Sequence, residues 1–207
     1  MASALRALRF REASWYSEAG GSRIHLHRDH CIGIVVDAQE RLFPYIHEHD
    51  RFAAATARLI RGLKILDVPV LAVQLYTKGL GETIAPLAAL LEDCPRFEKI
   101  SFSCCAEPSI LRALKLSGRR CVILAGFESH ACVLQTALDL LVERFLPVVV
   151  EDCVSSQREA DKRVAVERMR QEGARITTCE SILFELLGEA GTERFKQISR
   201  LVKEAGR

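Results

Sequence analysis

The sequence has few of the features that mark specialised classes of protein. Its longest apolar runs, 68–75 and 145–150, are far shorter than the roughly 20 residues that a membrane-spanning helix needs. Only 12 glycines and 6 prolines occur among 207 residues, which is too few for a collagen-like or a disordered chain. No Cys-x-x-Cys pair is present to indicate a zinc site. We therefore expect a globular protein with no membrane partner.

Charge of either sign is not in excess. The chain has 29 basic and 27 acidic residues, a net charge of +2, and these residues are scattered along it. Such a pattern does not indicate a surface that follows phosphates, so we expect no nucleic-acid partner. Arg6, Arg9 and Arg11 precede the first acidic residue, which faintly resembles a mitochondrial transit peptide. The expected location is the cytoplasm, with mitochondrial import as the alternative.

The cysteine and histidine residues do not form a disulfide framework or a metal motif. Eight cysteines are present, but no charged and then apolar signal peptide opens the chain, so we expect reduced and mostly buried thiols. Cys104 and Cys105 are adjacent, and a bridge between neighbours forms only with strain. His47 and His49 are two residues apart, which separates their directions on a helix. We expect no metal site.

The pattern of apolar segments indicates an α/β fold. Hydrophobic residues make up 49% of the chain, enough for one domain with a sizeable core. Short buried strands alternate with segments of helix length, which predicts βαβ units and a parallel sheet. The expected strands are 31–36, 68–75, 121–125, 146–150 and a weaker one at 174–178, with 97–102 as a further candidate.

Two later segments have the pattern of amphipathic helices. One follows Ser156 and ends at Gly173, which is suited to a left-handed stop. Its expected apolar face consists of Ala160, Val164 and Met169. The other spans 193–204, and its apolar side consists of Phe195, Ile198, Leu201 and Val202. We expect this last helix to dock on its own domain or on a second subunit.

Cys132 is the first candidate for chemistry. The strand at 121–125 leads through Gly126 into a helix whose expected N-cap is Ser129, so that Cys132 is the third helical residue. Its sulfur then lies near unpaired N–H groups and the positive end of the helix dipole, an arrangement that lowers a thiol pKa and favours a nucleophilic thiolate. Ligands bind at the carboxyl ends of such strands. The alternative is a buried, inert thiol.

Asp37 and Lys99 are the second and third candidates. Asp37 directly follows the apolar strand at 31–36, where a carboxylate could accept the thiol proton and return it to a leaving group. Its structural alternative is to cap the turn near Gln39. Lys99 lies in the short segment 97–102, and an ammonium near both groups would favour their charged forms. Its alternative is an ordinary surface lysine.

One further motif has two readings. Gly79-Leu80-Gly81 follows a strand and precedes a helix, like the start of a dinucleotide fingerprint. Ile84 occupies the place of the third glycine, so we interpret the motif as a turn.

These segments together resemble the isochorismatase-like cysteine hydrolase family, from about Cys31 to the C-terminus. The matching motifs are Val36-Asp37-Ala38-Gln39-Glu40 with Leu42-Phe43, Gln74-Leu75-Tyr76-Thr77-Lys78-Gly79-Leu80-Gly81-Glu82-Thr83, Glu98-Lys99 with Phe102-Ser103, and Gly126-Phe127-Glu128-Ser129-His130-Ala131-Cys132. The second motif is especially similar to the isochorismatase domain-containing branch. The resemblance implies a three-layer α/β/α sandwich around a mostly parallel, Rossmann-like sheet, formed by residues 31–207 after an N-terminal extension of residues 1–30.

The resemblance also implies a site. Asp37, Lys99 and Cys132 would form a catalytic triad, and a cis peptide between Phe127 and Glu128 would direct the backbone N–H groups of Glu128 and Cys132 to an oxyanion hole. The candidate residues of the substrate pocket are Gln39, Phe43, Gln74, Tyr76, Phe127 and Ser129.

Differences from the family's pattern narrow the expected chemistry. The Asp-x-His metal set of related nicotinamidases is replaced here by Gln74-Leu75-Tyr76, so we expect no metal and no cofactor. Isochorismatase itself cleaves a vinyl ether without a cysteine nucleophile, whereas this chain retains Cys132. We therefore expect a cysteine-dependent hydrolase of small amides or related acyl compounds, acting on C–N bonds other than peptide bonds through a thioester. The resemblance also implies a homo-oligomer. The alternative is an inactive binding or scaffold protein of the same fold.

Overall fold

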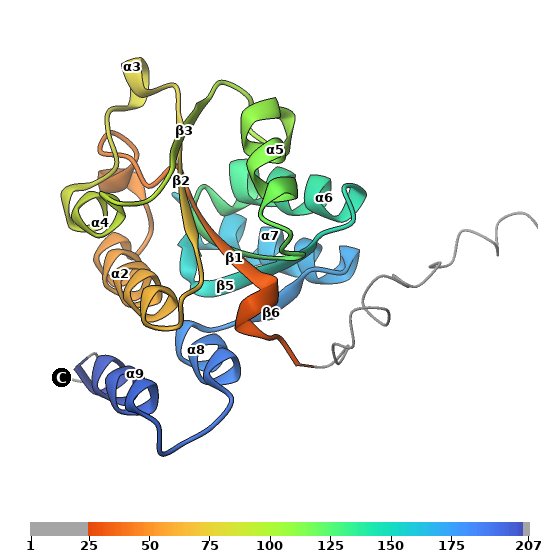
Figure 1. The fold of residues 1–207 in the computed structure, drawn as a ribbon. Helices are drawn as coiled ribbons and strands as arrows, with labels where there is room; N and C mark the ends of the chain where they lie inside the picture. Colours follow the sequence, from red (N-terminus) through yellow and green to blue (C-terminus); the bar gives the residue numbers. More distant parts are fainter. Residues whose placement is uncertain (1–24, 205–207) are drawn as a thin grey trace, which may run out of the picture.

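The computed structural model describes residues 25–204, and a parallel sheet of six strands forms its middle layer (Figure 1). The strand order is β3-β2-β1-β4-β5-β6, and every neighbouring pair is parallel. The strands are β1 (Cys31–Val36), β2 (Val70–Leu75), β3 (Arg96–Lys99), β4 (Cys121–Phe127), β5 (Leu146–Ser155) and β6 (Arg175–Thr177). This sheet confirms the expected α/β class.

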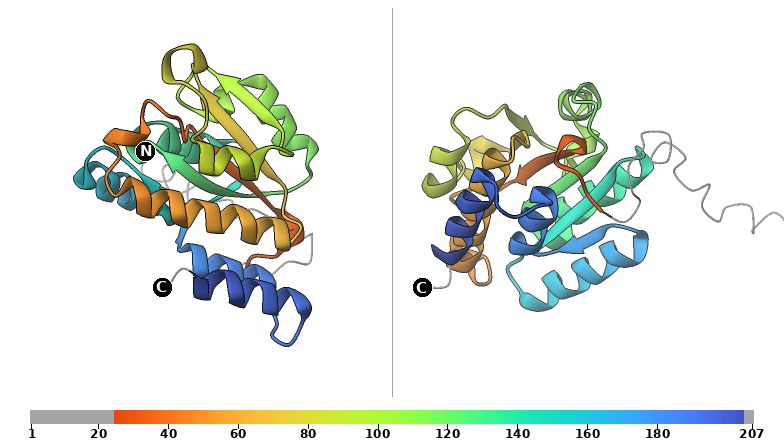
Figure 2. Two further views of the ribbon diagram at one scale, coloured as in Figure 1. Left: turned by 90° about the vertical axis from the view of Figure 1, so that its left-hand side faces the viewer. Right: turned by 60° about the horizontal axis from the view of Figure 1, so that its bottom comes forward.

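Helices cover both faces of the sheet, which gives the expected three layers (Figure 2). One core cluster joins the sheet to α2 (His49–Ile65), α4 (Ala85–Ala88), α8 (Cys179–Leu187) and α9 (Glu193–Lys203). The other joins it to α5 (Pro108–Leu116), α6 (Leu134–Val142) and α7 (Glu159–Glu172). The shorter helical segments are η1 (Arg28–His30), η2 (Phe43–Tyr45), α3 (Thr77–Leu80), η3 (Ala89–Leu91), η4 (Cys104–Ala106) and η5 (Ser129–Val133).

The central strands are buried on both faces, as their continuous apolar sequences predict. Every residue of β1 and β4 is buried. β5 is longer than the expected strand, since it continues from Val150 to Ser155 beyond the charged pair Glu151 and Asp152. Its pairing with β4 jumps from Leu124 opposite Val149 to Gly126 opposite Val154. A bulge in β5 therefore carries the charged residues, and an apolar pattern alone could not reveal this continuation.

The close approach of β1 and β4 depends on Gly126. Its φ is +127°, and a Cβ built on this residue would lie 1.9 Å from the carbonyl oxygen of Val36. No side chain fits at that distance, so glycine is required for the two strands to remain paired at their carboxyl ends.

The two predicted amphipathic helices are present, but the predicted apolar face of the first one was wrong. α7 ends at Gly173 in a left-handed conformation, as expected, but its buried residues are Ala165, Val166 and Met169. The predicted face was wrong, because Ala160 is exposed and Val164 is 59% exposed. Spacings of four and five residues drift around a helix with 3.6 residues per turn, so those side chains do not share one side. α9 packs against α2 and α8 of its own chain.

Disulfides, membrane-spanning helices and metal-binding clusters can be examined only within residues 25–204. All eight cysteines lie within residues 25–204, and none is in a disulfide. Within the same residues, no helix is long and apolar enough to cross a membrane, and no group of three metal-binding side chains is present. The arginines of the transit-peptide prediction lie outside the described residues. Leu26, inside the predicted extension, is 3% exposed and belongs to the core, and its N–H donates to Glu185 Oε1 at 2.7 Å.

Candidate active site

The fold brings the three predicted catalytic residues to one edge of the sheet. Asp37 directly follows β1, Lys99 is the last residue of β3, and Cys132 lies in η5, which begins one residue after the end of β4. The strand order reverses between β1 and β4, and the carboxyl ends of strands at such a point form the crevice where α/β proteins bind ligands. β2 separates β1 from β3, so the Lys99 side chain must reach across it toward Asp37.

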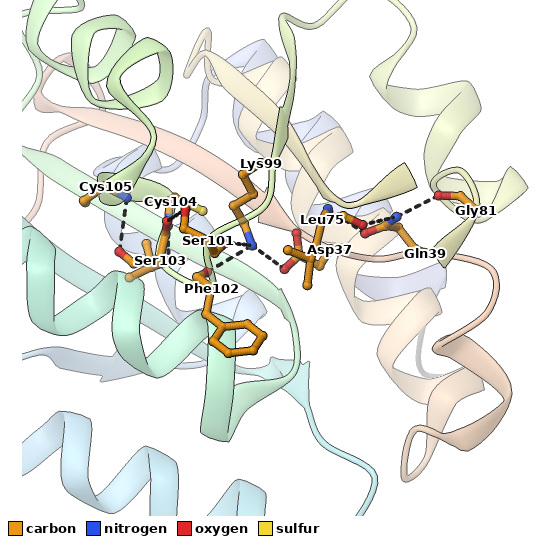
Figure 3. Close-up of polar contacts among 11 residues, drawn as sticks. Asp37, Gln39, Leu75, Gly81, Lys99, Ser101, Phe102, Ser103, Cys104 and Cys105 are labelled. Atoms are coloured by element: carbon orange, nitrogen blue, oxygen red, sulfur yellow. Dashed lines mark hydrogen bonds and ion pairs between the residues drawn. The ribbon is translucent and has the colours of Figure 1, made fainter. Parts of the chain in front are cut away.

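Lys99 and Asp37 form a fully buried ion pair (Figure 3). Nζ of Lys99 lies 2.8 Å from Oδ2 of Asp37, and neither side chain is exposed to solvent. Nζ also donates to the carbonyl oxygens of Ser101 at 3.1 Å and Phe102 at 3.0 Å. All three protons of the ammonium therefore have acceptors, which compensates for the cost of burying this charge.

The Asp37 carboxyl group has an environment suited to accepting a proton. Burial raises its pKa, while the charge of Lys99, the hydrogen bond from Lys99 and the neighbouring Cys132 thiol oppose this rise. The Oδ1 oxygen is buried and has no hydrogen-bond partner. The Asp37 backbone has a left-handed φ of 50°, and its N–H donates to the carbonyl of Val73 at 2.9 Å. This bond anchors the turn to β2.

Cys132 lies beside this pair, but its thiol is not the acidic one that the sequence predicted. This residue is 4% exposed, and the charges of Asp37 and Lys99 both act on its thiol. Burial, followed by the negative charge of Asp37, raises the pKa of Cys132 above its ordinary value, and Lys99 only partly offsets this. The expected lowering was therefore wrong, because desolvation and a neighbouring carboxylate both favour the neutral thiol.

The turn that carries Cys132 also differs from the prediction. Ser129 was expected as the N-cap of an α-helix, but the cap residue is Glu128, and residues Ser129–Val133 form a π-helical turn before α6. π-helical turns are rare and occur often at functional sites. The cis peptide between Phe127 and Glu128 is confirmed. Among the described residues, the N–H groups of Glu128 and Cys132 donate no hydrogen bond outside this turn.

Two of the predicted pocket residues have side chains that bond within the protein. Gln39 is fully buried, and its amide donates to the carbonyls of Leu75 at 3.0 Å and Gly81 at 2.7 Å, while its oxygen accepts from the Leu75 N–H at 2.8 Å. Gln74 is 3% exposed and donates to Glu82 at 2.9 Å and Thr83 at 3.1 Å. These amides connect the strand ends to the loop after β2.

The other four predicted pocket residues have different surroundings. Phe43 is half-buried against His49, with ring centroids 4.8 Å apart, and Tyr76 is half exposed. Phe127 is fully buried, and its ring lies 4.6 Å from that of Phe52. Ser129 is fully buried, and its hydroxyl has no hydrogen-bond partner.

The structure adds contacts that the sequence could not indicate. The backbone carbonyls of Ser101 and Phe102 accept hydrogen bonds from the Lys99 ammonium. Every residue type has such a carbonyl, so the sequence cannot indicate which residues provide these acceptors. Cys104 is fully buried near Lys99, and burial raises the pKa of Cys104 and of Cys105 to about 12. Burial therefore favours the neutral form of both thiols, and they are not joined in a disulfide.

Comparison with known proteins places these features in a family. The model of the isochorismatase domain matches residues 31–181. A secreted isochorismatase effector, Isc1, of Phytophthora sojae is 39% identical over 175 residues, covering 82% of this chain and 83% of the relative. Isochorismatase domain-containing protein 2 of Xenopus laevis is 36% identical, covering 81% of each chain. The solved structure of the MAR1 ribonuclease of Caenorhabditis elegans superposes with a TM-score of 0.82 at 35% identity, covering 86% of this chain and 92% of that one.

Proposed function

This chain belongs to the isochorismatase family of hydrolases, and we propose that it hydrolyses small amides or related acyl compounds with Cys132 as the nucleophile. The observation that carries this proposal is the buried pair of Lys99 and Asp37, 2.8 Å apart, with the buried Cys132 close enough for both charges to act on its thiol. A nucleophile, a proton acceptor and a fixed positive charge therefore meet at the carboxyl edge of the sheet.

The first half of the proposed reaction forms a thioester. Asp37 accepts the thiol proton as Cys132 Sγ attacks the carbonyl carbon of the substrate. The carbonyl oxygen takes up the negative charge and accepts hydrogen bonds from the N–H groups of Glu128 and Cys132. When the C–N bond breaks, Asp37 returns the proton to the leaving nitrogen. Lys99 remains an ammonium throughout, because its pKa is raised by the charge of Asp37 despite the opposing effect of burial.

The second half releases the acyl group. Asp37 takes a proton from a water molecule, which attacks the thioester carbon, and the departing sulfur recovers a proton from Asp37. The products are a carboxylic acid and the free thiol of Cys132. A resting thiol, rather than a thiolate, fits this scheme, since the proton leaves the sulfur only when a carbonyl carbon is within reach. The scheme requires no cofactor.

The experiment that tests this function measures ammonia released from a panel of small primary amides. We expect turnover by the unaltered protein, and a loss of at least about a thousandfold in Cys132→Ala and Asp37→Asn. Cys94→Ala is the matched control, because Cys94 is half-buried and outside the site, and it should keep full activity. Full turnover by Cys132→Ala would exclude the nucleophile, and no turnover of any amide would favour the inactive binding protein.

RNA belongs in the same panel, because the C. elegans relative is named a ribonuclease. The near balance of 29 basic and 27 acidic residues in this chain provides no excess of positive charge for binding a polyanion, which argues against RNA. Cleavage of RNA that survives Cys132→Ala would identify a second activity.

We also propose that the chain forms a homo-oligomer. Several large apolar side chains remain exposed on the single chain, including Ile100 at 82%, Val142 at 79% and Leu116 at 75%. A second subunit that packs on such side chains removes their apolar surface from water. Light scattering coupled to size-exclusion chromatography measures the molar mass directly, and a monomer at micromolar concentration would contradict the proposal.

A further inference from the structure

A groove lies beside the second half of β5, at the edge of the sheet. β6 pairs only with residues 148–150 of β5, so residues 151–155 have β4 on one side and no described strand on the other. The first half of α2, the first turn of α7 and the N-cap of α8 surround this open side and enclose about 500 Å³. The residues that line the groove do not include Asp37, Lys99 or Cys132. It is therefore separate from the candidate active site, and the proposed function gives it no role.

Two cationic side chains of the groove have no partner within the described residues. Arg58 of α2 and Lys162 of α7 both line the groove, and both are partly buried. Among residues 25–204, neither one forms an ion pair or a hydrogen bond. The charge of Lys162 acts on Glu48, but the two groups lie beyond ion-pair distance. Cations that lose part of their contact with water need acceptors in its place, and these two find none in the described chain.

The acidic side chains of the groove do not supply those acceptors. Glu48 forms an ion pair with Arg51 at 2.6 Å. Asp152 accepts the N–H of Cys179 at 2.8 Å, in the first turn of α8, where the helix dipole favours a negative charge. Glu151 is exposed, so water can solvate its carboxylate. Two of the three acids are thus already matched, and the two cations of the groove remain unmatched.

We infer that this groove binds a small molecule with at least two anionic oxygen groups, phosphates or carboxylates, through Arg58 and Lys162. A guanidinium presents paired N–H donors that match two oxygens of either group, and an ammonium attracts such oxygens as a point charge. The two cations belong to helices on opposite faces of the sheet, so a ligand with two anionic groups can bridge them. A volume of about 500 Å³ is typical of small-molecule sites.

A neighbouring hollow along α7 shares Lys162 but is less suited to an anion. Its volume is about 590 Å³, and its lining adds Glu159, Glu167, Arg163 and Arg170. Acidic residues outnumber Lys and Arg there by four to three, whereas the two kinds are equal in number in the groove beside α2. Repulsion between like charges therefore places the anion on the side of α2, where Arg58 lies.

The test measures binding of two probes, inorganic pyrophosphate and citrate, by isothermal titration calorimetry of the full chain in about 0.15 M salt. We expect saturable binding of one anion per chain for at least one probe. Arg58→Gln and Lys162→Gln should each raise the Kd by at least about tenfold, the effect of one charge-assisted hydrogen bond. Glu151→Gln removes a negative charge from the groove and should lower the Kd severalfold.

Two matched controls separate the groove from the overall charge of the protein. Arg61→Gln and Arg168→Gln each remove one positive charge from an exposed position, on α2 and α7 respectively, outside the groove. Both should leave the Kd within about twofold of that of the unaltered protein. Tighter binding of pyrophosphate would identify a phosphate ligand, and tighter binding of citrate would identify a carboxylate.

Three outcomes would overturn the inference. Neither probe binds saturably at millimolar concentration, or binding survives both Arg58→Gln and Lys162→Gln, which would place the anion elsewhere. In the third, the two controls weaken binding as much as the groove variants do, which would indicate only diffuse attraction to positive charge. Circular dichroism of each variant confirms that a raised Kd does not reflect unfolding. Amide turnover is not part of this test, so the proposed function can fail or hold independently.

Discussion

The side chain of Gln39 is hydrogen-bonded to both backbone groups of Leu75. The Leu75 N–H donates to Oε1 at 2.8 Å, and Nε2 donates to the Leu75 carbonyl at 3.0 Å, as a neighbouring strand would (Figure 3). Nε2 also donates to the carbonyl of Gly81 at 2.7 Å. Asp37 directly follows β1, and Lys99 is the last residue of β3. Strand β2 lies between these two strands, so the Gln39 amide fixes the end of the strand that separates Asp37 from Lys99.

The first prediction concerns Gln39→Leu. This substitution keeps the volume of the side chain but removes the partner of three part-buried backbone groups, so we expect the free energy of unfolding to fall by about 2–4 kcal/mol. Urea denaturation measures this change. The matched control is Gln197→Leu, on an exposed position of α9, which should change stability by less than about 0.5 kcal/mol. Equal midpoints for Gln39→Leu and the unaltered protein would show that these bonds contribute nothing net.

The role of Gln39 shows where sequence analysis loses resolution. Its motif indicated that it belongs near the site, but residue identity does not state whether an amide bonds to a ligand or to backbone. The central strands were predictable because residues buried on both faces form continuous apolar runs, as in β1. The bulge in β5 was not predictable from the sequence, because Glu151 and Asp152 interrupt the apolar run. Only the pairing with β4 shows that the strand continues.

The second prediction concerns the pH dependence of turnover. Asp37 must be ionised to accept the thiol proton, so activity should rise with pH through its pKa, which burial holds above the usual value near 3.8. The charge of Lys99 lowers this pKa. Lys99→Met removes that charge, and the acidic limb of kcat/KM against pH should therefore move to higher pH, together with a lower maximum. An unmoved limb would show that Asp37 is not the group that titrates.

The third prediction concerns stability. Lys99→Met leaves the Asp37 carboxylate buried without its partner, so we expect a loss of about 3–5 kcal/mol at pH 7. The pKa of Lys99 is raised above 10.5, so its stabilisation is complete below pH 10.5 and is lost as the pH rises through the higher value of the folded protein. The deficit of the variant should therefore shrink in alkaline solution. Thermal unfolding at pH 7 and pH 11 tests this, and a constant deficit contradicts it.

The fourth prediction concerns Gly126→Ala. The added Cβ would lie 1.9 Å from the Val36 carbonyl oxygen, and backbone cannot move as a flexible side chain does, so we expect no folded, soluble protein. Gly188→Ala is the control, since Gly188 also has a positive φ, +78°, but no atom within 4 Å of its added Cβ. It should cost only about 1 kcal/mol. Similar yields and melting temperatures for both variants would refute the steric argument.

The candidate triad was predictable as a set of residues, but its electrostatics were not. Asp37 directly follows β1 and Cys132 lies in the turn after the neighbouring parallel strand β4, and the carboxyl ends of such strands lie at one edge of the sheet. The protonation of Cys132 depends instead on burial and on its distance from Asp37, which a chain separation of about a hundred residues conceals. The position of Cys132 near a helix N-terminus, taken alone, predicted a lowered pKa, which is the opposite direction.

The fifth prediction concerns the effect of Asp37 on the pKa of Cys132. The charge of Asp37 raises the pKa of Cys132, so Asp37→Asn should lower it, and the Lys99 ammonium beside the sulfur should lower it further. Thiolate absorbance at about 240 nm, taken as the difference from the corresponding Cys132→Ala protein, reports this pKa. We expect thiolate to form at lower pH in Asp37→Asn than in the unaltered protein, while amide turnover is lost. A more acidic Cys132 thiol together with less turnover would mean that the reaction depends on proton transfer to Asp37 and not on a thiolate already present before the substrate binds. An Asp37→Asn protein that forms more thiolate and also gains activity would contradict this mechanism.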